Sequence, residues 1–224
     1  MIVDDRIRDY IHSLESGQGE LCDEIAKEAI MNYVPIIKQE TAALLKTLVV
    51  AQQPGAILEV GTAVGYSALL MAQVMPEDCH ITTIEKYEPR IPIAKENFRR
   101  SGRQDRITLL EGDAEEILAG LTENYDFVFM DAAKGQYIHW LPMVLKVLTP
   151  GGMLVSDNVF QDGDIVQSRY AVERRNRTIH SRMREYLYVL KHSEELETAL
   201  VPIGDGVAIS VKRRDDGRDY DEKD

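Results

Sequence analysis

Residues 56–67 read AILEVGTAVGYS, and this stretch decides the fold. A short apolar run ends at the glycine turn that holds Gly61 and Gly65, and the helical pattern ALLMAQVM follows at 68–75. A glycine turn between a strand and the next helix is typical of the first unit of a parallel sheet, where it lets the backbone approach a ligand at the helix N-terminus. Tight turns also need glycine for purely structural reasons, so this turn alone does not identify a ligand.

The pattern of a short apolar strand followed by a helical segment repeats downstream of this turn. Further strands are expected in HITTIE (80–85), ITLLE (107–111), YDFVFM (125–130) and GGMLVSD (151–157). Near-continuous apolar strands separated by helices indicate a parallel sheet that is covered on both faces. Two last strands, at 197–203 and 206–212, flank a Gly-Asp-Gly turn and predict an antiparallel hairpin at the sheet edge. We therefore expect an α/β, Rossmann-like fold with a mostly parallel seven-stranded sheet.

The length and composition favour one folded domain. The chain has 224 residues, and its 44% hydrophobic content excludes disorder throughout. The first 50 residues are expected to be helical and to cover the core or a partner chain. One helix face there is formed by Leu44, Leu45, Leu48 and Val49. We predict a single domain over residues 1–211 and a charged, disordered tail over 212–224.

Several features predict a cytoplasmic protein without a membrane partner. The N-terminal sequence MIVDDRIRDYIHSLE mixes charges with apolar residues, unlike a signal peptide. The most apolar early stretch, 42–51, is far shorter than the roughly 20 residues that a spanning helix needs. Cys22 and Cys79 have neither metal-ligand nor disulfide-framework spacing, which suits a reducing compartment.

The net charge of −12 repels polyanions on average, but the charge is unevenly distributed. Residues 161–191 hold seven basic and four acidic side chains, so this segment carries +3 and the rest of the chain −15. Any polyanionic partner is therefore expected to bind this segment.

Acidic residues end three successive predicted strands. Glu59 ends the first strand, where it suits a sulfonium and its amino-acid portion. Glu85 ends the second, 24 residues after Gly61, where a carboxylate accepts both hydrogen bonds of a ribose diol. Asp113 closes the third and suits an adenine amino group, although a helix N-cap would look the same. For Glu85 the alternative is a solvated carboxylate at a strand end. Together they suggest a nucleoside ligand without phosphate, which S-adenosylmethionine fits, and the GxxxG spacing disfavours a nicotinamide-dependent oxidoreductase.

The next two strands end in a candidate metal site. Asp131 follows the fourth strand, and Asp157 and Asn158 follow the fifth. Because neighbouring carboxyl ends converge on one crevice, these hard oxygen ligands would suit Mg²⁺ or a similar cation. Lys134 lies three residues past Asp131 and is a candidate base for a metal-bound hydroxyl. Loop caps and an ion pair of Asp131 are the structural alternative, and a noncatalytic binding protein would not need this set.

The segments EVGTAVGYS, IEKYEP, EGDAEE, FMDAAKGQY and VSDNV are similar to the cation-dependent O-methyltransferases of the catechol and caffeoyl-CoA type. The resemblance covers roughly residues 34–211. It implies a class I methyltransferase fold, a homodimer, Lys134 as base, and Mg²⁺, Mn²⁺ or Ca²⁺ held by Asp131, Asp157 and Asn158. It further implies an S-adenosylmethionine site lined by Ile37, Glu59, Gly61, Ser67, Glu85, Asp113, Ala114 and Asp131.

The stretch RRNRTIHSRMREYL at 174–187 carries the argument about the acceptor. As a helix it would turn an apolar stripe inward, formed by Ile179, Met183, Tyr186, Leu187 and Leu190. A row of arginines would stay exposed next to the catalytic site. These side chains are candidates for binding tRNA phosphates, and the alternative is an ordinary solvated helix face. The row is formed by Arg174, Arg175, Arg177 and Arg184.

The stretch resembles the bacterial branch of the family that methylates 5-hydroxyuridine at the tRNA wobble position to 5-methoxyuridine. This base offers a 5-hydroxyl beside a 4-carbonyl, so a cation can bind both oxygens as it would bind a catechol. The resemblance therefore implies tRNA as the substrate and partner. The alternative acceptor is a small catechol or a hydroxycinnamoyl thioester, which would not need the arginines.

Overall fold

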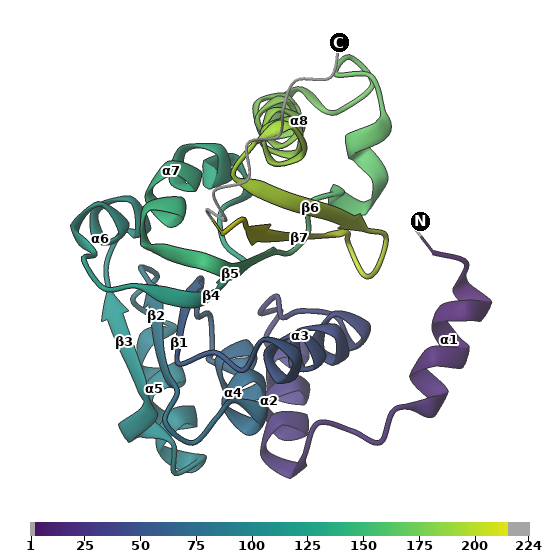
Figure 1. Ribbon diagram of the computed structural model, residues 1–224. Helices are drawn as coiled ribbons and strands as arrows, with labels where there is room; N and C mark the ends of the chain where they lie inside the picture. Colours follow the sequence, from purple (N-terminus) through teal and green to yellow (C-terminus); the bar gives the residue numbers. More distant parts are fainter. Residues whose placement is uncertain (1–2, 215–224) are drawn as a thin grey trace.

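The computed structural model describes residues 3–214, which form one seven-stranded sheet with helices on both faces (Figure 1). The strands are β1 (Ala56–Val60), β2 (His80–Glu85), β3 (Ile107–Glu111), β4 (Tyr125–Met130), β5 (Leu148–Ser156), β6 (Leu196–Val201) and β7 (Val207–Lys212). Their order across the sheet is β3-β2-β1-β4-β5-β7-β6.

The pairing confirms the expected topology. β1 pairs in parallel with β2 and β4, and the parallel part continues to β3 on one side and to β5 on the other. β7 pairs antiparallel with both β5 and β6, so the hairpin inserts its second strand next to β5 and leaves β6 at the edge. The chain order reverses between β1 and β4, which is where ligands bind in open α/β sheets.

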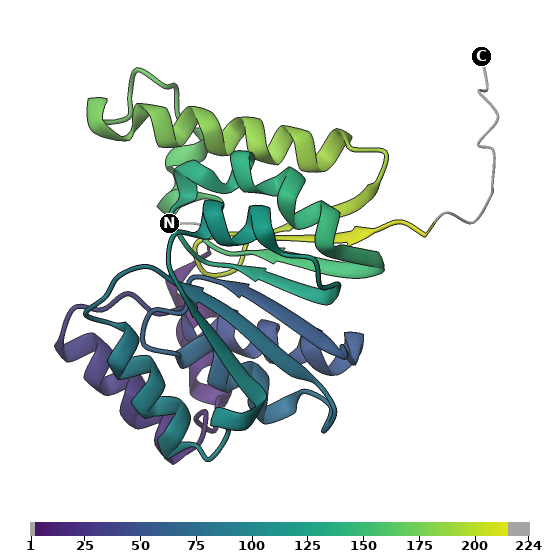
Figure 2. The same cartoon turned by 90° about the vertical axis from the view of Figure 1, so that its left-hand side faces the viewer.

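Two helical layers cover the sheet (Figure 2). The helices are α1 (Asp5–Leu14), α2 (Glu20–Met31), α3 (Gln39–Gln52), α4 (Tyr66–Val74), α5 (Ile91–Arg100), α6 (Ala114–Gly120), α7 (Tyr137–Val147) and α8 (Arg177–His192). Helices α2 to α5 pack on one face with strand residues such as Phe127 and Phe129. Helices α6 to α8 pack on the other face with Val128 and Met130. Alternate residues of β4 thus enter different cores, as the pleat requires.

The N-terminal helices do not all cover the core. Leu45 and Val49 of α3 are fully buried, as expected from the apolar face of that helix. In contrast, α1 has no buried residue and stands away from the body of the fold (Figure 1). It touches the fold through His12, whose Nε2 lies 2.7 Å from Oε2 of Glu40 on α3.

Helix α8 differs from its predicted stripe at one position. Met183, Tyr186, Leu187 and Leu190 are buried as predicted, but Ile179 is 37% exposed. His180, at 1% exposure, is buried in its place. The prediction for Ile179 is wrong because the segment between β5 and α8 packs over the face that carries His180, which the helical pattern alone could not show.

Three short 3₁₀ helices lie in the segments that follow β4 and β5 and matter for the site. They are η2 (Lys134–Gln136), η3 (Gln161–Val166) and η4 (Arg174–Asn176). At the C-terminus, β7 includes Lys212, and residues 215–224 of the predicted tail lie outside the described residues. Within 3–214, no helix combines the length and apolar character that crossing a membrane requires.

Candidate active site

The glycine turn joins β1 to α4 at the centre of the sheet. Gly61 has φ +107°, and a Cβ on it would collide with the backbone oxygen of Asp131 at the end of β4. Glycine is therefore required here for the close approach of two strand ends. The N–H groups of Gly61 and Thr62 both donate to the Ile84 oxygen, each at 3.1 Å, which also ties the turn to β2.

Glu59 lies behind this turn and is fully buried. Its carboxylate accepts hydrogen bonds from Ser67 Oγ and Thr83 Oγ1, each at 2.5 Å. Burial raises the pKa of Glu59 to about 7, because desolvation outweighs the two hydroxyl donors, and the charge of Asp131 adds to the rise. Glu59 and Ser67 are thus brought together, but their carboxylate and hydroxyl groups are already bonded to the fold.

Glu85, at the end of β2, is oriented by the backbone. Its Oε2 accepts from the N–H of Ala63 at 2.7 Å, and its Oε1 accepts from the N–H groups of Lys86 and Tyr87 at 3.0 and 2.8 Å. A carboxylate has about four acceptor sites, two on each oxygen, so Oε1 is fully used and Oε2 can accept one more hydrogen bond from a ligand.

Asp113 is the N-cap of α6. Its Oδ1 accepts from the Glu115 N–H at 2.9 Å, and its Oδ2 lies 3.3 Å from the Lys86 Nζ. These two donors lower the pKa of the Asp113 carboxyl, which stays ionised. The structural role that the sequence left open is therefore present, and the residue still faces the crevice described next.

A cavity of about 390 Å³ opens at the carboxyl ends of the central strands. Of the residues expected at the cofactor and base positions, the cavity is lined by Gly61, Glu85, Asp113, Ala114, Asp131 and Lys134. Those expected at the site that do not line it are Ile37, Glu59, Ser67, Asp157 and Asn158. Ile37 is buried in the core beside α3, Glu59 and Ser67 lie on either side of the glycine turn, and Asp157 and Asn158 follow β5.

Several lining residues were not predicted from the sequence, including Tyr87, Arg90 and Trp140. Trp140 lies in the first turn of α7 and is 5% exposed. Its indole Nε1 is buried and, within residues 3–214, has no hydrogen-bond partner. The available signal was its place in a helix that starts just after the end of β4, because such a first turn faces the crevice.

Asp131 and Lys134 meet at the mouth of the cavity. The Asp131 N–H donates to the Val60 oxygen at 3.0 Å, which fixes this residue against the end of β1. The Lys134 Nζ, on η2, lies 3.2 Å from Asp131 Oδ1. Both side chains are about one quarter exposed, so the ion pair is accessible from the cavity.

Asp157 follows β5 and is 5% exposed. Its N–H donates to the Met130 oxygen at 2.9 Å, so the ends of β4 and β5 are joined. Its Oδ1 is buried and finds no partner in the described part of the chain. Burial, and then the negative charge of Asp131, raise the pKa of the Asp157 carboxyl to about 7. Asn158 follows with φ +60°, a left-handed conformation that Asn tolerates better than most residues.

These features fit a hard cation. A buried carboxylate oxygen without a partner is costly, and a bound cation would compensate it. Asp131, Asp157 and Asn158 supply the oxygen ligands that Mg²⁺, Mn²⁺ and Ca²⁺ prefer. Within residues 3–214, no three or more His, Cys, Asp or Glu side chains are grouped with metal-ligand geometry. The predicted set is not a group of this kind, because it contains two acids and one amide.

The arginines expected to face tRNA have different environments. Arg177 donates to the oxygens of Val172 and Tyr170 at 3.2 and 3.3 Å, and Arg184 donates to the Ile165 oxygen at 3.1 Å. Both therefore brace the segment between β5 and α8. Arg175 and Arg174 lie on η4; Arg175 pairs with Glu173 at 2.7 Å, whereas Arg174 makes no hydrogen bond or ion pair with the described residues.

Comparisons with known proteins agree with this geometry. A family model described as O-methyltransferase matches residues 12–213. The tapetum-specific methyltransferase 1 of Arabidopsis thaliana is 27% identical over 203 residues, which is 86% of each chain. The catechol O-methyltransferase of Niastella koreensis is 35% identical over 115 residues, 49% of this chain and 52% of that one. A Staphylococcus aureus crystal structure, named as a candidate caffeoyl-CoA O-methyltransferase, is 31% identical with a TM-score of 0.85, covering 91% of this chain and 98% of that one.

Proposed function

The chain belongs to the O-methyltransferase family, and from this premise we propose that it transfers a methyl group from S-adenosylmethionine to an acceptor hydroxyl. The observation that carries the proposal is the lining of the central cavity, where Glu85, Asp113 and Asp131 stand at the ends of three strands. Glu85 is held by three backbone N–H groups, and its Oε2 keeps one acceptor site, which suits a ribose hydroxyl. The N–H of Trp140 is the donor available to the adenosine portion.

A divalent cation is the second part of the proposal. Asp131, Asp157 and Asn158 would hold Mg²⁺, Mn²⁺ or Ca²⁺, and the unpartnered Asp157 oxygen supports this assignment. When bound, such a cation lowers the pKa of an acceptor hydroxyl and offsets the charge on its oxygen. The Lys134 Nζ, which Asp131 positions, would take the proton of the acceptor hydroxyl. Methyl transfer between an oxyanion and a sulfonium neutralises both charges, so the chain contributes mainly orientation.

For the acceptor we propose the 5-hydroxyl of 5-hydroxyuridine at the tRNA wobble position, giving 5-methoxyuridine. The +3 segment 161–191 begins just after Asp157 and Asn158, so positive charge is concentrated next to the proposed cation site of an otherwise acidic chain. The vicinal 5-hydroxyl and 4-carbonyl oxygens of this base match a site that binds two neighbouring oxygens.

The test is methyl transfer from labelled S-adenosylmethionine to tRNA purified from a strain that lacks the enzyme. We expect label in 5-methoxyuridine after digestion to nucleosides, and no label with tRNA that lacks 5-hydroxyuridine. Reversing the charge at Arg174, which is exposed and forms no bond to the described fold, should weaken RNA turnover and reduce its salt dependence. Label that enters simple catechols but not tRNA would contradict the assignment.

A small catechol or a hydroxycinnamoyl thioester is the second candidate acceptor. The names of the Niastella koreensis and Staphylococcus aureus relatives favour it. Such an acceptor would be methylated at the same cation site, but its turnover should not respond to Arg174→Glu.

We further propose that the protein forms a homodimer through α1. The apolar face of this helix is exposed on the described chain and is formed by Ile7, Tyr10, Ile11 and Leu14. A helix with such a stripe is stable when the stripe is covered, and a second copy would cover it. Light scattering should give twice the chain mass for the wild type and the single mass for Tyr10→Glu. A wild-type monomer would contradict the proposal.

A further inference from the structure

A second cavity, of about 370 Å³, lies between α8 and the segment that follows η3. It shares no residue with the central cavity. Its lining is short and consists of Gln167, Ser168, Arg169, His180, Ser181 and Arg184.

This lining is positively charged and rich in hydrogen-bond donors. It holds two guanidinium groups, two hydroxyl groups and no carboxylate, in a chain of net charge −12. Arg169 makes no hydrogen bond or ion pair with the described residues, and Arg184 uses Nη1 to hold the Ile165 oxygen and keeps its other donors. Ser168 Oγ accepts from the Tyr170 N–H at 3.3 Å, so its own O–H remains available.

His180 is the second, independent observation at this cavity. The side chain is 1% exposed, and both ring nitrogens are buried without a partner anywhere in residues 3–214. Burying an imidazole without a hydrogen bond is unfavourable, so such a group calls for an explanation. A ligand that accepts hydrogen bonds in this cavity would supply one.

We propose that the cavity is a binding site for a phosphate group. Two arginines beside serine hydroxyls and a histidine are the donor set that binds phosphate oxygens. We propose that this phosphate belongs to the backbone of an RNA. This part of the inference rests on the proposed tRNA activity.

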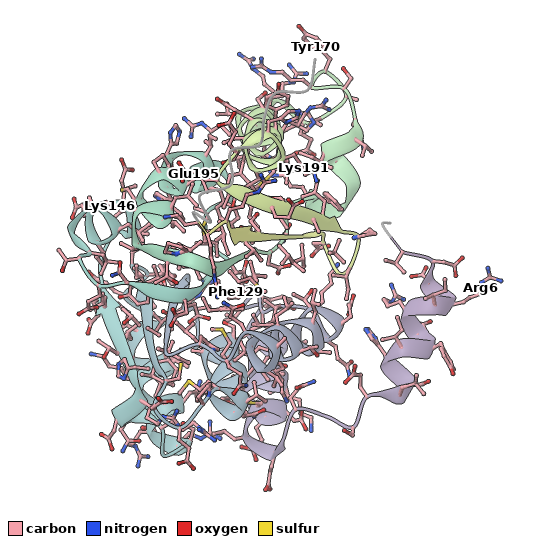
Figure 3. All side chains as sticks on the ribbon, in the orientation of Figure 1. Arg6, Phe129, Lys146, Tyr170, Lys191 and Glu195 are labelled. Carbon is pink, nitrogen blue, oxygen red and sulfur yellow. The ribbon has the colours of Figure 1, made fainter. Side chains whose placement is uncertain are left out.

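The surroundings of the cavity favour RNA as the source. Tyr170, which follows Arg169 in the sequence, is 82% exposed and points away from the fold beside the arginine-rich end of α8 (Figure 3). The Arg177 guanidinium lies 5.8 Å from the centre of its ring. An exposed aromatic ring next to arginines can stack on an unpaired base, as single-stranded RNA recognition requires.

The cavity is also connected to the catalytic residues. Arg182, on another side of α8, donates to the Gly135 oxygen at 3.1 Å and so holds the turn that carries Lys134. The segment that forms the other wall starts at Asp157. A phosphate bound here would therefore fix an RNA strand relative to both elements of the proposed methyl-transfer site.

The first experiment tests the phosphate site without using activity. We would record NMR spectra of histidine-labelled protein during titration with inorganic phosphate, using His180→Gln to assign the His180 signals. We expect saturable shifts of the His180 signals in the wild type and their loss in Arg169→Glu. The imidazoles of His80 and His139 serve as internal controls. Unchanged His180 signals at saturating phosphate would overturn the proposal.

The second experiment identifies the source of the phosphate, with an anticodon stem–loop RNA in one arm and coenzyme A in the other. We expect the RNA, and not coenzyme A, to compete with phosphate at His180. Arg169→Glu should raise the RNA KM about tenfold and reduce the salt slope by about 1, with kcat little changed. Lys27→Glu on α2 makes the same charge change at another exposed position and should have no effect.

The two experiments separate this inference from the proposed function. RNA methylation with an unchanged KM in Arg169→Glu would reject the cavity as the RNA phosphate site while the tRNA activity stands. Competition by coenzyme A alone, with no RNA methylation, would reject the tRNA substrate and assign the phosphate site to a thioester acceptor.

Discussion

The two halves of the proposed site differ in how their polar side chains are satisfied. The donor side is the half proposed to bind the methyl donor, S-adenosylmethionine. Its carboxylates, those of Glu59, Glu85 and Asp113, all accept hydrogen bonds from the chain itself. On the acceptor side, Asp157 Oδ1 and both ring nitrogens of His180 are buried without a partner among the described residues. The half that would bind S-adenosylmethionine is therefore preorganised by the fold, whereas the acceptor half holds buried polar atoms that a bound ligand would satisfy.

This difference follows from the elements that build each half. The donor side is made of strand ends and a glycine turn, where backbone N–H groups point at fixed positions and orient carboxylates at little entropic cost. The acceptor side is made of the segment between β5 and α8, which arginine side chains brace through carbonyl oxygens. Trp140 Nε1 is the exception on the donor side, and it is the donor-side atom we expect to be satisfied by a ligand.

We expect the strongest loss of activity from a substitution at Asp157. Asp157→Ala should lower methyl transfer by about 1,000-fold or more, because the loss of a cation ligand removes several kcal/mol of transition-state stabilisation. Affinity for S-adenosylhomocysteine, measured by calorimetry, should change little. Without added cation, the free energy of unfolding of the variant should equal or exceed that of the wild type, because the variant loses a buried carboxylate oxygen that has no partner among the described residues. Retained turnover with added Mg²⁺ would contradict the assignment.

The next effect concerns stability and the buried donor side. An unfolded chain releases the Glu59 proton near pH 4.5, whereas the folded chain retains it up to about pH 7. Unfolding therefore releases a proton between these values, so Glu59 lowers the free energy of unfolding by about 3 kcal/mol as pH rises, and Asp157, whose pKa is also raised to about 7, adds a separate fall. Glu59→Gln should make the fall shallower by the Glu59 contribution, as measured by urea unfolding from pH 4 to 8 against the wild type. An equal slope in both proteins would show that Glu59 does not titrate in this range.

A smaller effect is expected at Glu85. Glu85→Ala should weaken S-adenosylhomocysteine binding by roughly 10- to 100-fold, because it removes the ribose acceptor and leaves three backbone N–H groups without it. The exposed neighbour Glu88→Ala is the matched control and should bind normally. Equal affinity of the two variants for S-adenosylhomocysteine would show that Glu85 does not bind the ribose.

The smallest effect tests the exception on the donor side. Trp140→Phe removes an N–H that has no partner in the described structure, so stability should be unchanged or slightly higher. If this N–H binds the adenosine portion, affinity for S-adenosylhomocysteine should fall about fivefold. A loss of stability with unchanged affinity for S-adenosylhomocysteine would show that Trp140 serves only in packing.

Much of the fold could be predicted because its signals are local. The strand at 56–60, the glycine turn and the acidic residue that ends each strand are consecutive in sequence, so the sheet and the positions of Glu85, Asp113 and Asp131 follow from the pattern. The prediction that Asp131 and Lys134 lie together also rests on a three-residue spacing. Burial of Glu59 behind the turn did not follow, because it depends on Ser67 and Thr83 reaching it from two other elements.

The acceptor side could not be predicted to the same depth because it depends on contacts between distant segments. Helical spacing placed Ile179 in the core, but packing of the segment before α8 buried His180 instead. Spacing also could not tell that Arg177 and Arg184 bond to backbone oxygens while Arg174 does not. The isolation of α1 was equally hidden, because an amphipathic pattern gives an apolar face without saying what covers it.

The proposed cation site can be tested by titrating the protein with Mn²⁺ and following the electron paramagnetic resonance of the free ion. We predict one bound Mn²⁺ per wild-type chain, displaced by Mg²⁺, and no specific binding by Asp157→Ala. Equal binding by the variant, or a wild-type chain that binds none, would contradict the account.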